Sequence, residues 1–326
     1  MKKFTFGILA YNQSNLIRET LESIKFQKLQ YGEDIAVSLI VADDASSDGT
    51  ADVVRGWFDE NKENFENVEL IANKKNKGTV ANYLTILSKI DNENFKILAG
   101  DDLIGHRNLF VEYENLNSKK IKTYVRVELK NGQVYCPEKY LIKFYYHKTH
   151  SQRKGYHQKH FRKESYFHTP STLYSKQLFV SANCEKNLEG YYLYEDEPTW
   201  YSMVKNEKDL DAEFGDHAIV LYRIHDKSVS NVPNTGFKNE LKKLRKQYYD
   251  DSKGFERLYF VILMRFTNAP MYLNLGLYLE KITALKHEWI CRHDKKYQVF
   301  KQKIEQQVEE EQRYYEMIQA AVSEND

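Results

Sequence analysis

Short apolar runs and helical patterns alternate through the first hundred residues, and this alternation constrains the fold more than any other feature. The apolar runs are "FTFGILAY" (4–11), "DIAVSLIVADD" (34–44), "NVELIAN" (67–73) and "FKILAGDD" (95–102). The helical patterns between them are "SNLIRETLESIKFQ" (14–27), "SDGTADVVRGWFDEN" (47–61) and "TVANYLTILSKI" (79–90), the first two starting at the expected caps Ser14 and Asp48. Strands separated by helices of this length pair in parallel through right-handed crossovers. The sequence therefore predicts an α/β fold.

Polar residues stand where three of these strands end. They are Ala10-Tyr11-Asn12, Asp43-Asp44 and Asp101-Asp102. Ligands of open parallel sheets bind outside the carboxyl ends of the strands. Aspartate is also common before helices as a cap, but three polar strand ends converging on one edge favour a binding site.

The paired acids need positive partners. Neighbouring carboxylates repel and are costly to desolvate, so a basic side chain or a metal ion is expected against Asp101 or Asp102. The first turn lacks the three glycines of a dinucleotide-binding motif, and no P-loop lysine motif occurs. What remains is a nucleotide site built from acids, with Asp43 on a base or ribose and Asp101 on a diphosphate through Mg²⁺ or Mn²⁺.

Composition limits the partners and the compartment. The 48 basic and 47 acidic residues give a net charge of +1, so we expect no nucleic-acid partner. The three cysteines, at 136, 184 and 291, lack metal spacing and suit a reducing compartment. The apolar run 258–264 falls short of the roughly 20 residues that span a bilayer. We expect a cytoplasmic protein, with peripheral contact at the inner face of the membrane through that run.

Two later segments invite functional interpretations. Residues 139–163, "KYLIKFYYHKTHSQRKGYHQKHFRK", mix basic, histidine and aromatic side chains without an acid. They could form a solvated loop or bind acceptor phosphate or another polyanion, and the sequence leaves both open. Beyond residue 235 the chain is helical in character. Its last helix carries a thin stripe of Ile304, Val308, Tyr315 and Ile318, which predicts homo-oligomerisation through the C-terminal helices.

An ordered set of motifs resembles family 2 glycosyltransferases of the GT-A fold over roughly residues 3–231. The motifs are "ILAYNQSNLIRETLESI" (8–24), "VADDASSDGTADVV" (41–54), "NKGTVANY" (76–83), "ILAGDDL" (97–103), "YEDEPTW" (194–200) and "LYRIHDKSVS" (221–230). The resemblance implies a mixed GT-A sheet flanked by helices in residues 1–235, with a nucleotide-binding half (1–104) and an acceptor half (105–235). A helical C-terminal region (236–326) follows.

The resemblance also implies a role for each donor-site position. Those expected to contact the nucleotide-sugar are Ala10, Tyr11, Asn12, Asp43, Asp44, Asn76, Lys77, Gly78, Asn82, Gly100, Asp101 and Asp102. Among them, Asp43 would hydrogen-bond the base and Asp44 would support it. Asp101 would bind the metal, and Asp102 would orient the sugar or a metal-bound water. Ala99 replaces the first acid of the family's fuller motif, so His225 is a second candidate metal ligand, with a structural hydrogen bond as its alternative.

In the acidic motif, the resemblance makes Asp196 the catalytic base of an inverting reaction, while Glu195 positions the sugar or the helix start. An acidic helix N-terminus stabilised by the helix dipole is the plainer alternative. Thr169, Ser171 and Thr172 are expected to face the acceptor sugar. Trp200 would be an acceptor platform or a core residue.

These roles imply a metal-dependent inverting transferase. It would move a sugar from a nucleotide-sugar, with a UDP-sugar favoured, to a hydroxyl of a glycan or lipid-linked oligosaccharide, in bacterial surface polysaccharide synthesis. A sugar-nucleotidyltransferase is one alternative, but "AYNQSN" lacks the glycine-rich basic loop that class carries after its first strand. A non-enzymatic polyanion-binding module is another, and it leaves the ordered acids unexplained.

Overall fold

The central sheet contains four parallel strands in the order β3-β2-β1-β4. The computed structural model describes residues 2–225, 235–266 and 275–324. The strands are β1 (Lys2–Ala10), β2 (Ile35–Asp43), β3 (Asn67–Ala72) and β4 (Phe95–Ala99), and the helices between them are α1 (Ile17–Tyr31), α2 (Thr50–Asn61) and α3 (Thr79–Lys89). The α/β prediction is confirmed.

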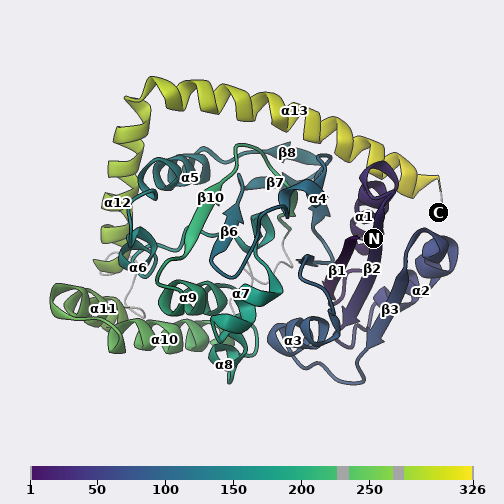
Figure 1. The fold of residues 1–326 in the computed structure, drawn as a ribbon, viewed down its shortest axis with the longest axis horizontal. Helices are drawn as coiled ribbons and strands as arrows, with labels where there is room; N and C mark the ends of the chain where they lie inside the picture. Colours follow the sequence, from purple (N-terminus) through teal and green to yellow (C-terminus); the bar gives the residue numbers. More distant parts are fainter. Residues whose placement is uncertain (1, 226–234, 267–274, 325–326) are drawn as a thin grey trace.

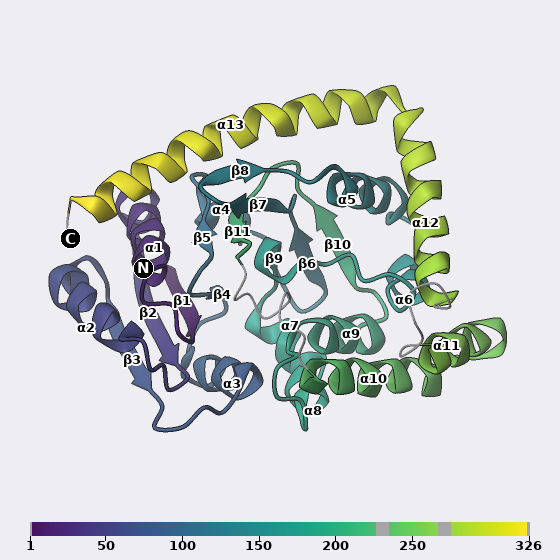
Figure 2. The same ribbon diagram turned by 180° about the vertical axis from the view of Figure 1, so that it is seen from behind.

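The register of this sheet places the polar strand ends side by side. Ala10 pairs with Asp43, and Leu9 pairs with Ala99. The residues after β1, β2 and β4 therefore leave the sheet at one edge. Nearly all of β1 and β2 is buried, because helices cover both faces of the sheet (Figures 1 and 2).

The two expected helix caps differ in outcome. Ser14 lies outside α1, whose N-cap residue is Leu16. Asp48 does hold the start of α2, since its Oδ1 accepts from the N–H of Thr50 at 3.0 Å. It also accepts from the N–H of Ser14 at 3.0 Å through Oδ2, which ties the loops after β1 and β2 together.

The second half of the chain adds two small sheets beside β4. One has the order β10-β6-β9 and the other the order β5-β11-β7-β8. Their strands are β5 (Leu103–Ile104), β6 (Lys120–Thr123), β7 (Val127–Lys130), β8 (Gln133–Tyr135), β9 (Thr172–Leu173), β10 (Asp211–Phe214) and β11 (Val220–Arg223). Around them lie α4 (Leu109–Glu112), α5 (Glu138–His150), α6 (Tyr156–His160), η2 (Thr169–Ser171), α7 (Lys176–Ser181), α8 (Cys184–Leu188) and α9 (Asp196–Asn206), whereas the short helix η1 (Lys62–Asn64) lies between α2 and β3.

Residues 139–163 fold into α5 and α6, so the solvated-loop interpretation of this segment is wrong. Leu141, Phe144 and Tyr145 of α5 are buried in the core. The apolar residues repeat at helical spacing, and the basic residues between them occupy the remaining faces.

The described residues from 235 onward form the helices α10 (Thr235–Asp250), α11 (Gly254–Phe266), α12 (Leu275–Arg292) and α13 (Lys295–Ser323). Helix α13 runs along one side of the molecule from α12 to α1 (Figures 1 and 2). Among the described residues, no helix has both the length and the apolar character needed to cross a bilayer.

The apolar stripe of α13 packs against its own chain. Ile304, Tyr315 and Ile318 are each at most 2% exposed, and Val308 packs beside them. The stripe is covered because α13 lies on α1 and β8. It therefore does not form the self-association surface expected from the sequence.

Candidate active site

Asp43 has one carboxylate oxygen without a partner. The residue is 2% exposed; its Oδ2 accepts from the N–H of Ser46 at 3.1 Å, whereas Oδ1 is buried with no hydrogen bond. A buried acceptor of this kind is costly unless a donor reaches it. The ring N–H of a nucleobase is a donor of the right type.

Asp44 holds the loop that connects β3 to α3. Its Oδ1 accepts from the N–H of Lys77 at 2.7 Å, and its Oδ2 accepts from the N–H of Gly78 at 2.9 Å. Asn82 donates to the carbonyl of Gly78 at 2.9 Å and accepts from Asn73 at 2.6 Å. These contacts bring the predicted residues of the loop together beside Asp43.

Gly78 is required by its backbone and its neighbour. Its φ is +84°, and a Cβ there would lie 2.5 Å from the carbonyl oxygen of Tyr192. Tyr192 also donates its hydroxyl to Asn76 Oδ1, and its carbonyl accepts from Val80 N at 3.1 Å. The segment that leads to the acidic motif thus lies against the loop held by Asp44.

The residues after β1 form the other wall. Asn12 has a φ of +52°, donates its N–H to Ser46 Oγ at 2.8 Å and accepts from Ser47 N at 2.9 Å. Tyr11 is 51% exposed, so its ring is available to a ligand. Ala10 is buried at the end of β1.

The paired acids after β4 each have a basic partner, as their repulsion requires. His225 Nε2 lies 2.7 Å from Asp101 Oδ2. Arg223 donates its backbone N–H to Asp102 Oδ1 at 2.9 Å and its Nε to the carbonyl of Asp101 at 2.8 Å. Gly100 permits the turn between strand and acids, because a Cβ there would lie 2.6 Å from Gln13 Oε1. Of the segment 221–230, residues 226–230 lie outside the described residues.

The carboxyl of Asp102 is fully buried. Burial and the adjacent Asp101 carboxylate raise the pKa of Asp102 well above its ordinary value, against the opposing charges of Arg223 and Lys96. Its Oδ2 is buried without a partner.

Lys96 of β4 belongs to the site, although its position was not predicted. It is 3% exposed and donates to the carbonyls of Thr169 and Thr172 at 3.2 Å each. Burial lowers the pKa of Lys96 to about 7, although the charges of Asp102 and Asp196 act to raise it. The Lys96 ammonium therefore links the acids after β4 electrostatically to the acidic motif.

The acidic motif begins helix α9. Desolvation and the neighbouring Asp196 raise the pKa of Glu195 well above its ordinary value. Desolvation also raises the pKa of Asp196, against hydrogen bonds with Glu195 and Thr169. Glu197 points elsewhere, since its carboxylate accepts from Tyr194 and, at 3.0 Å, from Tyr248.

Three of the four predicted acceptor residues are buried side chains that support the site. Ser171 and Thr172 are at most 2% exposed, and Thr172 Oγ1 donates to the carbonyl of His168 at 2.8 Å. Trp200 is 1% exposed and packs edge-on against Tyr174, so it is not an acceptor platform. These positions cannot face an acceptor because tertiary packing covers them.

Thr169 occupies a different position. It is partly buried, and its Oγ1 accepts from Trp200 Nε1 at 2.9 Å. The Thr169 hydroxyl also acts to lower the pKa of Asp196. Trp200 therefore holds the hydroxyl of Thr169.

The residues around Asp101 suit a hard divalent cation. A carboxylate is a ligand that Mn²⁺ and Mg²⁺ prefer, an imidazole lies beside it, and the buried free Oδ2 of Asp102 offers a further oxygen nearby. With two protein ligands, the remaining coordination positions would fall to phosphate oxygens and water.

Comparisons with known proteins define the class. The family model "Glycosyl transferase family 2" matches residues 5–179, more than half of the 326-residue chain. The chain belongs to glycosyl transferase family 2 and is a glycosyltransferase. No curated protein sequence matches it.

Solved structures share the GT-A fold at low sequence identity. S. aureus TarS 1–349 in complex with UDP-GlcNAc matches at 12% identity and a TM-score of 0.56, covering 98% of this chain and 92% of that one. The complex of TarS 1–349 with UDP matches at 13% identity and a TM-score of 0.53, covering 100% and 92%. A longer S. aureus TarS structure matches at 13% identity and 0.52, covering 81% of this chain, and the match spans only 43% of that longer chain.

Proposed function

We propose that this chain is a metal-dependent inverting glycosyltransferase that moves a sugar from a UDP-sugar to a hydroxyl of a glycan or a lipid-linked oligosaccharide. The main support for this proposal is the buried Lys96, whose charge interacts with both Asp102 and Asp196. Asp102 is one of the strand-end acids of the nucleotide half, and Asp196 begins α9 in the second half. Their shared interaction with Lys96 supports placing both groups of acids in one reaction site.

The nucleotide preference rests on Asp43. Its unpaired Oδ1 would accept the ring N–H of uracil, and the exposed Tyr11 ring would contact the base. Asn76, Lys77, Gly78 and Asn82 would surround the ribose and diphosphate. The UDP and UDP-GlcNAc complexes of TarS support this choice through a shared fold.

Asp101 and His225 would hold the divalent metal, Mn²⁺ or Mg²⁺. When bound, the metal supplies positive charge to the leaving diphosphate. Arg223 keeps the two aspartates oriented through its backbone and side chain. Asp102 would orient the transferred sugar.

Asp196 would take the proton of the acceptor hydroxyl, which then attacks the anomeric carbon opposite the departing UDP and inverts its configuration. A raised pKa brings the carboxylate closer to the pH at which it must bind a proton. Glu195 would help to position the sugar, and Thr169 acts to lower the pKa of Asp196.

The C-terminal helices would bring the enzyme to a membrane surface, where a lipid-linked acceptor of bacterial surface polysaccharide synthesis is found. The side chains that support this are large, apolar and at least 39% exposed on α11 and α12, namely Phe255, Leu258, Val261, Ile282, Leu285 and Trp289. Exposed apolar side chains on adjoining helices are candidates for a contact surface. In this proposal residues 1–235 carry the reaction and residues 236–326 carry the association.

A nucleotide-sugar screen tests the proposal. Hydrolysis of UDP-, dTDP- and GDP-sugars is followed with Mn²⁺ present, and each active donor is repeated with the Asp196→Asn variant. We expect cleavage of a UDP-sugar that the variant loses. Cleavage of no nucleotide-sugar, or equal cleavage by the variant, contradicts the proposal.

A further inference from the structure

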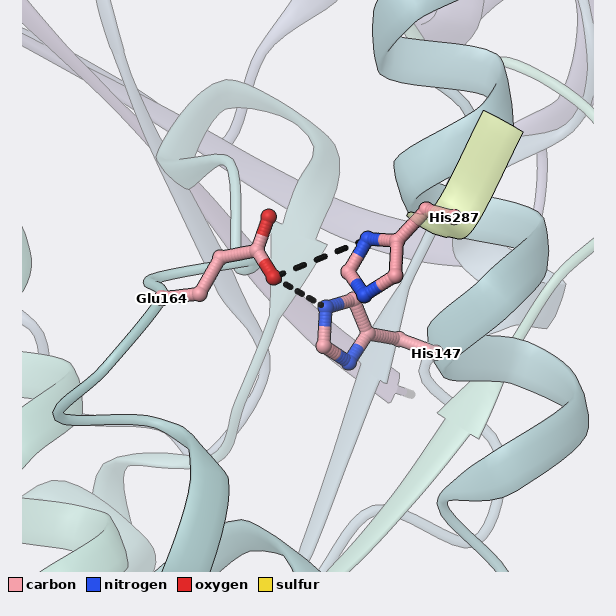
Figure 3. A group of neighbouring side chains, drawn as sticks. All are labelled: His147, Glu164 and His287. Carbon is pink, nitrogen blue, oxygen red and sulfur yellow. Dashed lines mark hydrogen bonds and ion pairs between the residues drawn. The ribbon is translucent and has the colours of Figure 1, made fainter. Parts of the chain in front are cut away.

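Two histidines and a glutamate that have no role in the proposed reaction lie close together. His147 comes from α5, Glu164 from the loop after α6, and His287 from α12 (Figure 3). One possible ligand atom of each lies within 4.8 Å of the others. The three residues are separated by 17 and 123 positions in the chain, so only the tertiary fold brings them together.

The individual distances suit a small divalent ion. Glu164 Oε2 lies 3.3 Å from His147 Nε2 and 3.7 Å from His287 Nδ1. Ligands placed about 2.0–2.1 Å from zinc in a tetrahedron are separated by similar distances. Figure 3 shows both imidazole rings turned toward the same carboxylate oxygen.

The surroundings fix the orientation of both rings. Tyr156 Oη lies 2.9 Å from the other ring nitrogen of His147, and Tyr166 stacks on that ring at 3.9 Å. Tyr146 stacks on His287 at 3.6 Å. A partner on the second nitrogen of a histidine is the usual support of a metal ligand.

The cluster borders a cavity of about 460 Å³ between α5, α10, α11 and α12, and Glu164 and His287 line its wall. An ion at the cluster would therefore have access to water from the cavity. Lys143 lies 3.5 Å from Glu164 Oε1 and leaves Oε2 for the ion.

We propose that His147, Glu164 and His287 bind one Zn²⁺ ion, with a cavity water as the fourth ligand. Imidazole and carboxylate are zinc ligands, and three protein ligands with one open position is a recurrent zinc arrangement. The ion joins α12 to α5 and to the loop after α6. The site is separate from Asp101 and His225. The zinc proposal therefore does not depend on the proposed transfer reaction.

Zinc binding is measured on the full chain carrying Asp101→Asn, which weakens any metal binding at the donor site. We expect one equivalent of zinc per chain after dialysis, and an intense tetrahedral absorption band when Co²⁺ replaces it. Adding Glu164→Gln or His287→Gln should abolish both, whereas His293→Gln, an exposed histidine just after α12, should leave them unchanged. Tyr156→Phe should weaken binding roughly 10- to 100-fold.

X-ray absorption at the zinc edge keeps the test decisive if a variant fails to fold. The Asp101→Asn protein should show two imidazoles and oxygen ligands around zinc. Binding below one equivalent, a spectrum without two imidazoles, or unchanged binding in the folded Glu164→Gln and His287→Gln proteins would overturn the proposal.

Discussion

Arg223 donates its backbone N–H to Asp102 Oδ1 at 2.9 Å, although 121 residues separate the two in sequence. The guanidinium of the same residue also pairs with Glu19 of α1. Arg223 therefore anchors the strand-end acids to the helix that follows β1. The repulsion between Asp101 and Asp102 is thus relieved by protein groups as well as by the proposed metal.

Asp43→Ala should weaken UDP binding by roughly 10- to 100-fold, the value of a hydrogen bond to a charged group, because the unpaired Oδ1 is lost. Isothermal titration calorimetry with UDP measures the effect, and thermal unfolding checks the fold. Asp52→Ala, an exposed acid in α2, serves as the control. An Asp43→Ala protein with wild-type UDP affinity would refute the role of Asp43.

Asp196→Asn should lower kcat by roughly 10²- to 10⁴-fold, as expected when a general base is lost, while UDP affinity stays unchanged. Glu197→Gln should have a smaller effect, because that carboxylate is bonded to Tyr194 and Tyr248. Glu195→Gln should also have less effect, since one carboxylate alone can stand in line with the anomeric carbon. Steady-state kinetics of the three variants tests which carboxylate is the base. If Asp196→Asn turns over at the wild-type rate, the acidic motif serves only as the start of helix α9.

Chelation by EDTA should abolish sugar transfer, and Mn²⁺ or Mg²⁺ should restore it, because Asp101 and His225 are the two candidate ligands of the catalytic ion. Asp101→Asn should raise the Mn²⁺ concentration needed for half-maximal activity. A matched substitution at Asp91, which pairs with Lys3 on the surface, should not. Full activity in EDTA would exclude this metal assignment.

Acidification should destabilise the fold between pH 6.5 and about 4. Burial lowers the pKa of both His147 and His157 from 6.5 to about 4. In this window the unfolded chain binds protons that the folded chain does not, so the free energy of unfolding falls as pH falls. Each histidine contributes roughly 3 kcal/mol.

Urea unfolding of metal-free protein at pH 7 and at pH 4.5 measures this loss. His157→Gln keeps a polar partner for Tyr166, which lies 2.7 Å from His157 Nδ1, but removes the titration. The variant should therefore lose less stability on acidification than the wild type. An identical pH dependence would show that His157 is not held neutral.

Ile304→Ala should lower the free energy of unfolding by about 2–5 kcal/mol, because the side chain is 1% exposed in the core. Light scattering should give the same molecular mass for variant and wild type, since the stripe is covered within the chain. Val299→Ala, on the exposed face of α13, should change neither quantity. A lower molecular mass for Ile304→Ala than for the wild type would show that the stripe forms a contact between copies of the chain.

The parallel sheet and the strand-end acids could be predicted because both depend on local patterns. Strand and helix periodicities alternate along the chain, and each polar strand end directly follows its apolar run. The structure adds a contact that this pattern does not predict, because Asp44 accepts from the backbone N–H groups of Lys77 and Gly78.

The features that could not be predicted depend on contacts between distant segments of the chain. A lone lysine in an apolar strand gives no sign that its charge interacts with both Asp102 and Asp196, so Lys96 was missed. Trp200 and Thr172 carry the right side chains for sugar contact, but packing in the second half of the chain buries them. A narrow apolar stripe on α13 likewise does not specify whether its partner is α1 or another molecule.

Helix α13 is connected to Asp101 and Asp102 through Arg223. Its Tyr315 ring lies 5.8 Å from the guanidinium of Arg223, which in turn holds Asp101 and Asp102. During synthesis, the sheet and its acids emerge from the ribosome long before residue 315. A nascent chain stalled ahead of α13 would already contain Asp101, Asp102 and Arg223, but Arg223 would still lack its contact with the Tyr315 ring.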